Sequence, residues 1–176
     1  MKPLYVASRA SLLTRPNMWK FLRREGWNII STWIDECGPE ETKDFTALWF
    51  RIQGEIQASC GLILYAETED FPLKGAYVEV GMALAYGKPV AVVLPGVEIE
   101  LPHVRPVGSW INHPQVRVFQ SVFVARDWIY AGADWQEPLT GSGVIKSVGP
   151  LRVAEILQAN EPVISPGSKL SGPYKP

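Results

Sequence analysis

The sequence predicts an α/β protein, with one domain built on a doubly wound parallel sheet. Short apolar runs, which are typical of buried strands, alternate with longer segments in which apolar residues recur at helical spacing. Two of these runs, residues 61–66 and 89–95, are apolar throughout, as expected of strands that helices cover on both faces. This repeated alternation favours parallel strands joined by right-handed crossovers. It is typical of flavodoxin-like and Rossmann-like folds.

The first half of the chain contains four predicted strand segments with helices between them. Residues 3–8 form the first strand, and a helix follows and ends at Gly26. Residues 27–35 are rich in β-branched and aromatic residues and are predicted as a second strand. The next helix lies within residues 38–59, which have a proline near their start and acids in the first turns. The apolar runs 61–66 and 89–95 are the third and fourth strands, and a helix that contains Glu79 connects them.

The pattern is weaker beyond residue 95. Residues 116–122 are predicted as a fifth strand, residues 133–143 as a loop and residues 149–160 as a closing helix. Residues 161–176 are dense in Pro, Gly and Ser, which is typical of a tail that has no core of its own. We therefore expect one domain over residues 1–160 and a C-terminal tail over residues 161–176.

The bulk properties favour a small-molecule partner. The chain has 176 residues and a formal net charge of -1, so no overall charge favours a nucleic acid or an anionic membrane as partner. Cys37 and Cys60 are too few and too far apart for a disulfide framework or a zinc site, and we expect a cytoplasmic protein. The glycine-rich fingerprints of nucleotide triphosphatases and dinucleotide-binding proteins are absent, so we expect no cofactor and no metal.

Polar side chains that follow the predicted strands are the first candidates for a site, because ligands of open α/β sheets bind at the carboxyl ends of the strands. These side chains are Ser8, Arg9 and Ser11 after the first strand, Asp35 after the second, and Glu67, Glu69 and Asp70 after the third. The acidic run 67–70 matches no metal motif and is predicted to be a solvated loop. His103 and His113 are predicted to lie on the surface of a proline-rich loop.

Glu79 is the only formally charged residue between Ala76 and Gly87. A helix with apolar residues on most faces is buried, and a buried carboxylate is costly unless it is paired or hydrogen-bonded. Three interpretations stay open: a catalytic role, a carboxylate favoured by the positive end of the helix dipole, or a structural pair with Arg9 or Lys74.

Five of the seven tryptophans divide into two groups. Trp19, Trp33 and Trp49 lie on predicted elements and are expected in the core. Trp110 and Trp128 are candidates for the wall of a pocket that binds a base or a sugar.

Three segments resemble the nucleoside 2-deoxyribosyltransferases and their relatives, the nucleotide N-glycosidases. They are "LYVAS" in the first strand, "LILYAETED" in the third strand and its loop, and "KGAYVEVGMALAYGKPVAVVLP" from residue 74. In the last segment, a turn that contains Gly75 precedes a Glu-x-Gly step formed by Glu79 and Gly81. The resemblance covers roughly residues 3–95. It rests on the three segments taken together rather than on any one of them.

The resemblance implies roles for particular residues. Glu79 matches the family's nucleophile, and Tyr5 matches the tyrosine that orients it. Asp70 or Asp35 would donate a proton to the departing base, and Arg9 resembles the basic residue placed near a 5′-phosphate. Ser8, Ser11, Gly75, Gly81 and Trp110 complete the expected binding residues, with Gly81 allowing close approach to the helix.

Two acids of the family pattern are absent. An aspartate is common just ahead of the third strand, where this chain has Ser59 and Cys60, and another lies six residues before the nucleophile, where this chain has Leu73. These departures concern the groups that hold the base and transfer its proton. Asp70 is the nearest acid to the second position.

The function that the resemblance implies is cleavage or exchange of the N-glycosidic bond of a (deoxy)nucleoside or nucleoside monophosphate, through a covalent glycosyl ester on Glu79. The alternatives are a non-catalytic nucleotide-binding sensor and a structural protein with the same fold. The expected partner is a small nucleoside or nucleotide, without a nucleic acid polymer or a membrane. The apolar composition and the family's habit of building sites at subunit contacts also predict a homo-oligomer.

Overall fold

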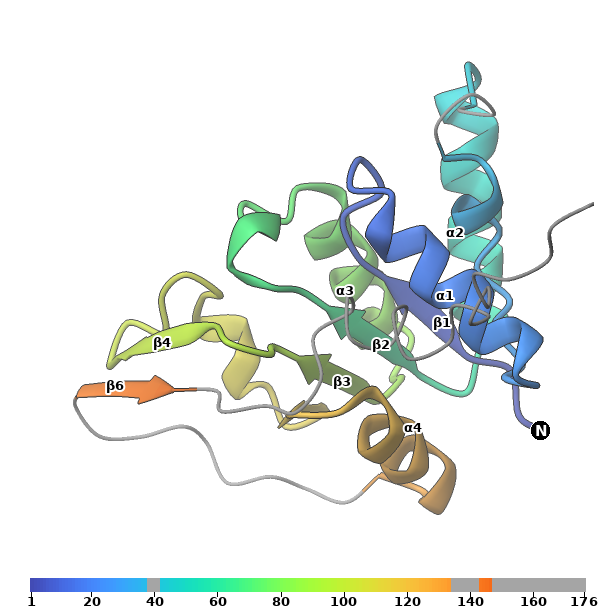
Figure 1. Cartoon of the computed structure of the whole chain (residues 1–176). Coiled ribbons are helices and arrows are strands. Elements are labelled where there is room, and N and C mark those ends of the chain that lie inside the picture. Colours follow the sequence, from blue (N-terminus) through green and yellow to red (C-terminus); the bar gives the residue numbers. More distant parts are fainter. Residues whose placement is uncertain (38–41, 134–142, 147–176) are drawn as a thin grey trace, which may run out of the picture.

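Four parallel strands form the central sheet in the order β1 (Tyr5–Ala7), β2 (Leu62–Tyr65), β3 (Val90–Val93) and β5 (Val116–Phe119) (Figure 1). The structure is a computed structural model that describes residues 1–37, 42–133 and 143–146. Every residue of β1, β2 and β3 is buried. This explains why these strands are apolar throughout, since both faces of the sheet are covered.

The helices alternate with these strands along the chain. The α-helices are α1 (Thr14–Arg24), α2 (Phe45–Ala58), α3 (Gly75–Ala85) and α4 (Val122–Ala131), and the short 3-10 helices are η1 (Thr32–Asp35), η3 (Thr68–Asp70) and η4 (Ser109–Asn112). No helix in the described part of the chain is both long and apolar enough to cross a bilayer.

The order of the chain segments across the sheet is that of a flavodoxin-like fold. An isolated parallel bridge pairs Leu4 with Ile29 and so places the second segment of the chain beside β1. Across the sheet, the segment at Ile29 comes first and is followed by β1, β2, β3 and β5. When these five segments are numbered along the chain, their order is 2-1-3-4-5, as in flavodoxin. The predicted doubly wound α/β fold is confirmed.

The two faces of the sheet carry different helices. Tyr65 of β2 makes an edge-to-face contact with Trp19 of α1, and a Cβ added to Gly61 would meet Ile129 of α4 at 2.7 Å. On the opposite face, Tyr5 of β1 reaches Glu79 of α3, and α2 packs against α3. Figure 1 shows α1 and α4 on the near side of the sheet and α3 on the far side.

The predicted second strand, residues 27–35, is wrong beyond the bridge at Ile29. The hydroxyl of Ser31 accepts a hydrogen bond from the Val6 backbone N–H at 2.7 Å, and the Trp33 indole donates to the Val6 carbonyl at 2.8 Å. Side chains thus replace the strand partners that Val6 would otherwise need, because buried backbone groups must be paired. The chain is then free to turn into η1.

The later part of the chain contains elements that the pattern did not predict. The fifth strand is confirmed as β5, but α4 and a two-stranded antiparallel sheet of β4 (Glu98–Leu101) and β6 (Gly143–Lys146) were missed. The β4–β6 pair lies to one side of the four-stranded sheet (Figure 1). The predicted loop falls mostly, and the closing helix 149–160 and the tail 161–176 wholly, outside the described residues.

Candidate active site

The carboxylate of Glu79 and the hydroxyl of Tyr5 form the centre of the site. Tyr5 donates a hydrogen bond to Glu79 Oε1 at 2.8 Å, joining strand β1 to the second turn of α3. Tyr5 has no exposed surface and Glu79 is 7% exposed. Only a small part of the Glu79 side chain is therefore accessible, and Tyr5 fixes one of its two carboxylate oxygens.

Burial controls the charge of this pair. Loss of water raises the pKa of Glu79 to about 8, the like charge of Glu55 adds to this effect, and the Tyr5 hydrogen bond opposes it. Burial also raises the pKa of the Tyr5 phenol, and the neighbouring Glu79 carboxylate raises it further. Tyr5 therefore acts as a hydrogen-bond donor near neutral pH, and Glu79 is largely protonated at pH values below about 8.

A cavity of about 240 Å³ opens beside Glu79 and has two chemically different walls. We call one the polar wall, formed by Ser8, Arg9 and Ser11 from the loop after β1 and by Lys74 from the turn before α3. We call the other the aromatic wall, formed by Trp33 of η1 and by Leu48, Trp49 and Ile52 of α2. Pro72, Leu73, Gly75 and Ala76 complete the lining with Ala10. A ligand with one polar and one flat apolar part fits this division.

The turn that begins α3 is strained at Lys74. Its φ of 44° and ψ of -111° are rare for a residue with a side chain, and the Ala76 N–H donates to the Leu73 carbonyl at 3.0 Å across the turn. Gly75 follows it, where a Cβ would lie 3.7 Å from Cη2 of Trp49. The backbone of the first turn of α3 and the Trp49 ring therefore lie against each other at the cavity.

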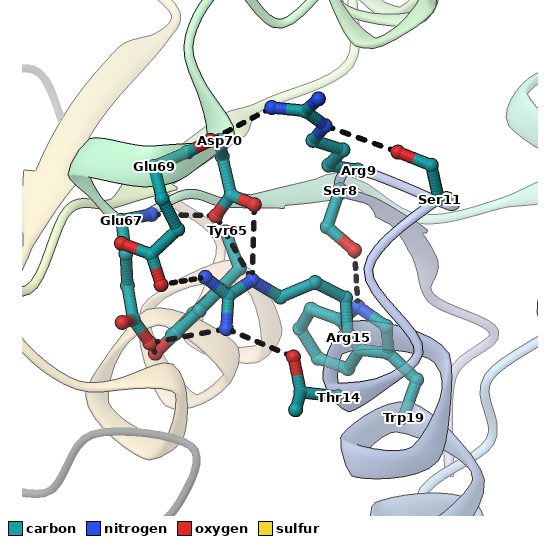
Figure 2. Close-up of polar contacts among 10 residues, drawn as sticks. All are labelled: Ser8, Arg9, Ser11, Thr14, Arg15, Trp19, Tyr65, Glu67, Glu69 and Asp70. Atoms are coloured by element: carbon teal, nitrogen blue, oxygen red, sulfur yellow. Dashed lines mark hydrogen bonds and ion pairs between the residues drawn. The ribbon is translucent and has the colours of Figure 1, made fainter.

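Arg9 is held at the polar wall by its neighbours. Its Nη1 donates to the Glu69 carbonyl at 2.7 Å and its Nε donates to the Ser11 hydroxyl at 3.0 Å (Figure 2). Ser8 is fixed as well, because its hydroxyl accepts from the Trp19 indole at 3.0 Å. The expected structural pair between Arg9 and Glu79 is not formed, since Arg9 is directed to the loop after β2.

Asp70 lies away from the cavity, in a buried cluster around Arg15 (Figure 2). Arg15 Nε contacts both Asp70 oxygens, at 3.2 and 2.9 Å, and its two Nη atoms reach Glu67 at 3.3 Å and Glu69 at 2.9 Å. Burial alone would lower the pKa of Arg15, but the carboxylates around it raise it. The structure therefore does not bring Asp70 to the position of a proton donor.

The prediction of a solvated acidic loop is wrong for two of its residues. Asp70 is fully buried and Glu67 is 9% exposed, and Glu67 also accepts from the Tyr65 hydroxyl at 2.6 Å. Asp70 Oδ2 accepts from the Glu67 backbone N–H at 2.7 Å. The partner that explains this burial is Arg15, which the sequence gives no local signal to find.

Asp35 is also outside the cavity. It lies at the end of η1, where Arg23 Nη1 donates to its Oδ2 at 2.8 Å, and its side chain is half-exposed. The structure does not bring Asp35 and Glu79 together at one cavity. Among the described lining residues, Glu79 is therefore the only acid.

Trp19 and Trp33 are buried in the core, as predicted, and Trp33 also lines the Glu79 cavity together with the partly buried Trp49. Trp110 lies at a second hollow with Tyr77, Val80, Gly81 and Val107. Trp128 lines a third hollow. Gly81 is exposed, and a Cβ there would meet no atom within 4 Å, so no close approach explains this glycine.

The fold and the site together define a flavodoxin-like α/β protein with a buried carboxylate at the carboxyl edge of its sheet. No protein-family model matches the chain, and no curated protein matches its sequence. The fold is similar to that of the 2-deoxyribosyltransferase from the psychrotolerant bacterium Bacillus psychrosaccharolyticus. That match has a TM-score of 0.53 and 16% identity, and covers 78% of this chain and 99% of that one.

Two further solved structures match more loosely. The CMP N-glycosidase BcmB from Clostridium botulinum has a TM-score of 0.41 and 16% identity, over 74% of this chain and 97% of that one. BlsM has a TM-score of 0.45 and 14% identity, over 94% of this chain and 98% of that one. Of these three matches, the 2-deoxyribosyltransferase supports a shared fold, and its 16% identity leaves the activity to be argued from the site.

Proposed function

We propose that this protein cleaves or exchanges the N-glycosidic bond of a nucleoside or nucleoside monophosphate, with Glu79 as the nucleophile. The observation that carries the proposal is the 2.8 Å hydrogen bond from Tyr5 to Glu79 at the wall of a cavity. A buried carboxylate that keeps one oxygen fixed and faces a ligand-sized space is what a covalent glycosyl transfer needs. The 2-deoxyribosyltransferase with the same fold makes this chemistry a natural candidate.

The reaction has two displacements at the same carbon. One Glu79 oxygen bonds to C1′ of the sugar, and the C1′–N bond breaks with its electron pair going to the base. Water or a second base then bonds to C1′ and loses one proton, and the ester bond between C1′ and the Glu79 oxygen breaks to return the carboxylate. The proton lost balances the one that the departed base takes up. Two inversions retain the configuration of the sugar. Tyr5 positions the carboxylate in both steps through its hydrogen bond.

The polar wall supports a substrate with a 5′-phosphate. Arg9 and Lys74 supply positive charge, and Ser11 adds a hydroxyl among the same lining residues. A guanidinium offers strong charge-assisted bonds to a phosphate, and here two neighbours already fix its direction. The aromatic wall would receive the flat base.

The balance between transfer and hydrolysis depends on the space that the first base leaves. A transferase must hold a second base there by hydrogen bonds, and the described aromatic wall offers Trp33, Leu48 and Trp49 for stacking. This composition favours hydrolysis, or slow exchange, over efficient transfer.

The test is incubation of the protein with deoxynucleosides and nucleoside monophosphates, with and without a second free base, followed by chromatography. A base-exchanged product identifies a transferase, and a free sugar or sugar phosphate identifies a hydrolase. Intact-mass measurement of a rapidly quenched sample should show the glycosyl adduct, and peptide mapping should place it on Glu79. The matched control is Glu79→Gln, which keeps the shape but removes the nucleophile.

A non-catalytic nucleotide-binding sensor is the second candidate. It is favoured by the pairing of Asp70 with Arg15 and of Asp35 with Arg23, which occupies both expected proton donors. Binding of nucleoside monophosphates without turnover, across all common bases, would support this candidate and contradict the first.

A further inference from the structure

The described part of the cavity combines a nucleophile with no second carboxyl group. Glu79 is the only carboxyl among the described lining residues, and the remaining polar groups are the hydroxyls and cations of the polar wall. An ordinary neutral base leaves a sugar as an anion unless an acid gives it a proton. Such proton transfer typically contributes about 10²- to 10⁴-fold to a rate. Substrates that need no proton therefore gain most from this site.

We propose that the preferred substrates are nucleoside monophosphates whose leaving heterocycle already carries a positive charge, such as an N7-alkylated purine or a pyridinium. This inference rests on the proposed function and names its substrate class. A cationic heterocycle departs as a neutral molecule and requires no acid from the protein.

The step balances without a further reactant. A Glu79 oxygen bonds to C1′, the C1′–N bond breaks, and its electron pair neutralises the positive heterocycle. Water then bonds to C1′, the ester bond to Glu79 breaks, and the proton of the water passes to solvent. The products are a neutral heterocycle, a sugar phosphate and the original carboxylate.

The surroundings of Glu79 suit a cation. Trp49 lies at the cavity beside the first turn of α3, the helix that carries Glu79, and Trp33 lies on the same wall. Aromatic faces attract cations, and the attraction grows when water is excluded. Glu55 adds a second negative group, close enough to act electrostatically on both Tyr5 and Glu79. The two ends of such a substrate, anionic phosphate and cationic heterocycle, match the polar and aromatic walls.

A positively charged heterocycle would also favour the ionised form of Glu79, which is the form that attacks. Burial raises the pKa of Glu79 to about 8, so the proton must be lost before attack. A positive heterocycle beside the carboxylate favours its ionised form, whereas a neutral base of the same shape only removes more water from it. Charge on the substrate therefore selects for reaction as well as for binding.

The test compares a matched pair, 7-methylguanosine 5′-monophosphate and guanosine 5′-monophosphate, each as ribo- and 2′-deoxyribonucleotide. The two differ by one methyl group and one positive charge. After subtraction of the spontaneous rates, we expect kcat/KM to be about 10²- to 10⁴-fold higher for the methylated member. Comparable values would show that the protein protonates the base itself, and would overturn the inference while leaving the proposed function.

Three other outcomes bear on this inference and on the proposed function together. Cleavage of neither member, nor of any nucleoside in the broader screen, would overturn both. Cleavage that persists in Glu79→Gln would overturn the nucleophile and with it the cation argument. Enzyme-dependent cleavage of the methylated member that disappears in Glu79→Gln supports both.

A second variant tests the aromatic wall separately. Trp49→Leu keeps an apolar side chain but removes the ring, and should raise KM for the methylated member about two- to thirtyfold, the range of a cation and ring interaction. The unmethylated member should lose less, and Trp49→Phe should restore most of the difference. Equal losses for both members would show that Trp49 acts by packing alone and would contradict the cation site.

Discussion

Tyr5 Oη and Glu79 Oε1 lie 2.8 Å apart, although 74 residues separate them in the sequence. The bond crosses from the first strand of the sheet to the second turn of α3, and both side chains are buried. It offsets part of the cost of burying a carboxylate, because a buried polar group without a partner is strongly unfavourable. The first two predictions follow from this bond.

Glu79→Gln should leave the fold intact and lower turnover by at least about a thousandfold, on the scale of losing a covalent nucleophile. The amide keeps the shape and still accepts a hydrogen bond from Tyr5, so circular dichroism and thermal unfolding should remain native. Turnover at the wild-type rate would rule out the mechanism. Tyr5→Phe is the companion variant, which should retain the nucleophile but lose its orientation.

Glu79 should also dominate the pH dependence of the free energy of unfolding and of the activity. Its pKa of about 8 in the folded protein compares with an ordinary 4.5, so between these values the folded state holds a proton that the unfolded state has lost. The free energy of unfolding should therefore fall as pH rises from 4.5 to about 8, by at most about 1.4 kcal/mol per pH unit. Activity should change in the opposite direction, rising with pH as the carboxylate forms.

Urea unfolding of wild type and Glu79→Gln across this range measures the effect directly. The ionisable groups that act on Glu79 are Tyr5 from β1 and Glu55 from α2, and Arg9 and Lys74 line the same cavity. All of them remain in the variant, so the difference between the two curves isolates Glu79. A difference that is flat from pH 5 to pH 8 would contradict the raised pKa. Tyr5→Phe should shift the activity profile to higher pH, because the hydrogen bond that lowers this pKa is lost.

Arg9→Ala should weaken the binding of nucleoside monophosphates by at least about tenfold, on the scale of one lost charge-assisted bond, and should change nucleoside binding little. Isothermal titration with each ligand pair measures the difference. Arg9→Lys is the matched control, because it keeps the charge but loses the planar fork that contacts the Glu69 carbonyl and Ser11. Equal losses for nucleoside and monophosphate would show that Arg9 maintains the loop rather than binding phosphate.

Much of this site could be predicted from the sequence because its central residue breaks a local pattern. Glu79 stands out as one charge in an apolar helix, and the strand runs locate it at the correct edge of the sheet. Tyr5 gives no such signal and was found through the resemblance alone. The parallel sheet follows from alternating strands and helices, which is a local property of the chain, whereas the strand order is seen only in the structure.

The rest depends on contacts between distant parts of the chain. Arg15 and Asp70 are 55 residues apart, so nothing near Asp70 indicates that its charge is already paired. Trp33 and Trp49 have the spacing of core residues, and their place at the cavity depends on contacts with distant segments, such as that of Trp49 with Gly75 at the start of α3. The strict alternation of "EIEL" in β4 is a signal that was present and missed, with Glu98 and Glu100 exposed and Ile99 and Leu101 buried.

The assembly of the protein remains a prediction. Phe45 and Phe50 of α2 are 59% and 72% exposed, and Val78 of α3 is 49% exposed, on two helices that pack together. We expect light scattering at micromolar concentration to show a homo-oligomer, and Phe50→Glu to reduce its mass. A monomer with full activity would contradict this expectation, and Thr46→Glu, also exposed on α2, controls for added charge alone.

The last prediction concerns the cluster that supports Arg9. Asp70→Asn removes one charge from a fully buried ion pair and leaves Arg15 with fewer partners, and breaking such a pair typically costs about 3–5 kcal/mol. Glu69→Gln removes a charge whose side chain is 58% exposed, and should cost less than about 1 kcal/mol. Urea unfolding at neutral pH compares the two variants.

The same pair of variants tests whether the cluster positions Arg9 as well as stabilising the loop. The Glu69 carbonyl that holds Arg9 lies between the two buried acids of the loop, so Asp70→Asn should also weaken monophosphate binding while changing nucleoside binding less. Glu69→Gln keeps that backbone carbonyl and should bind both ligands almost as the wild type does. A stability loss in Asp70→Asn with unchanged monophosphate binding would show that the cluster is structural only, because the carbonyl would then reach Arg9 without it.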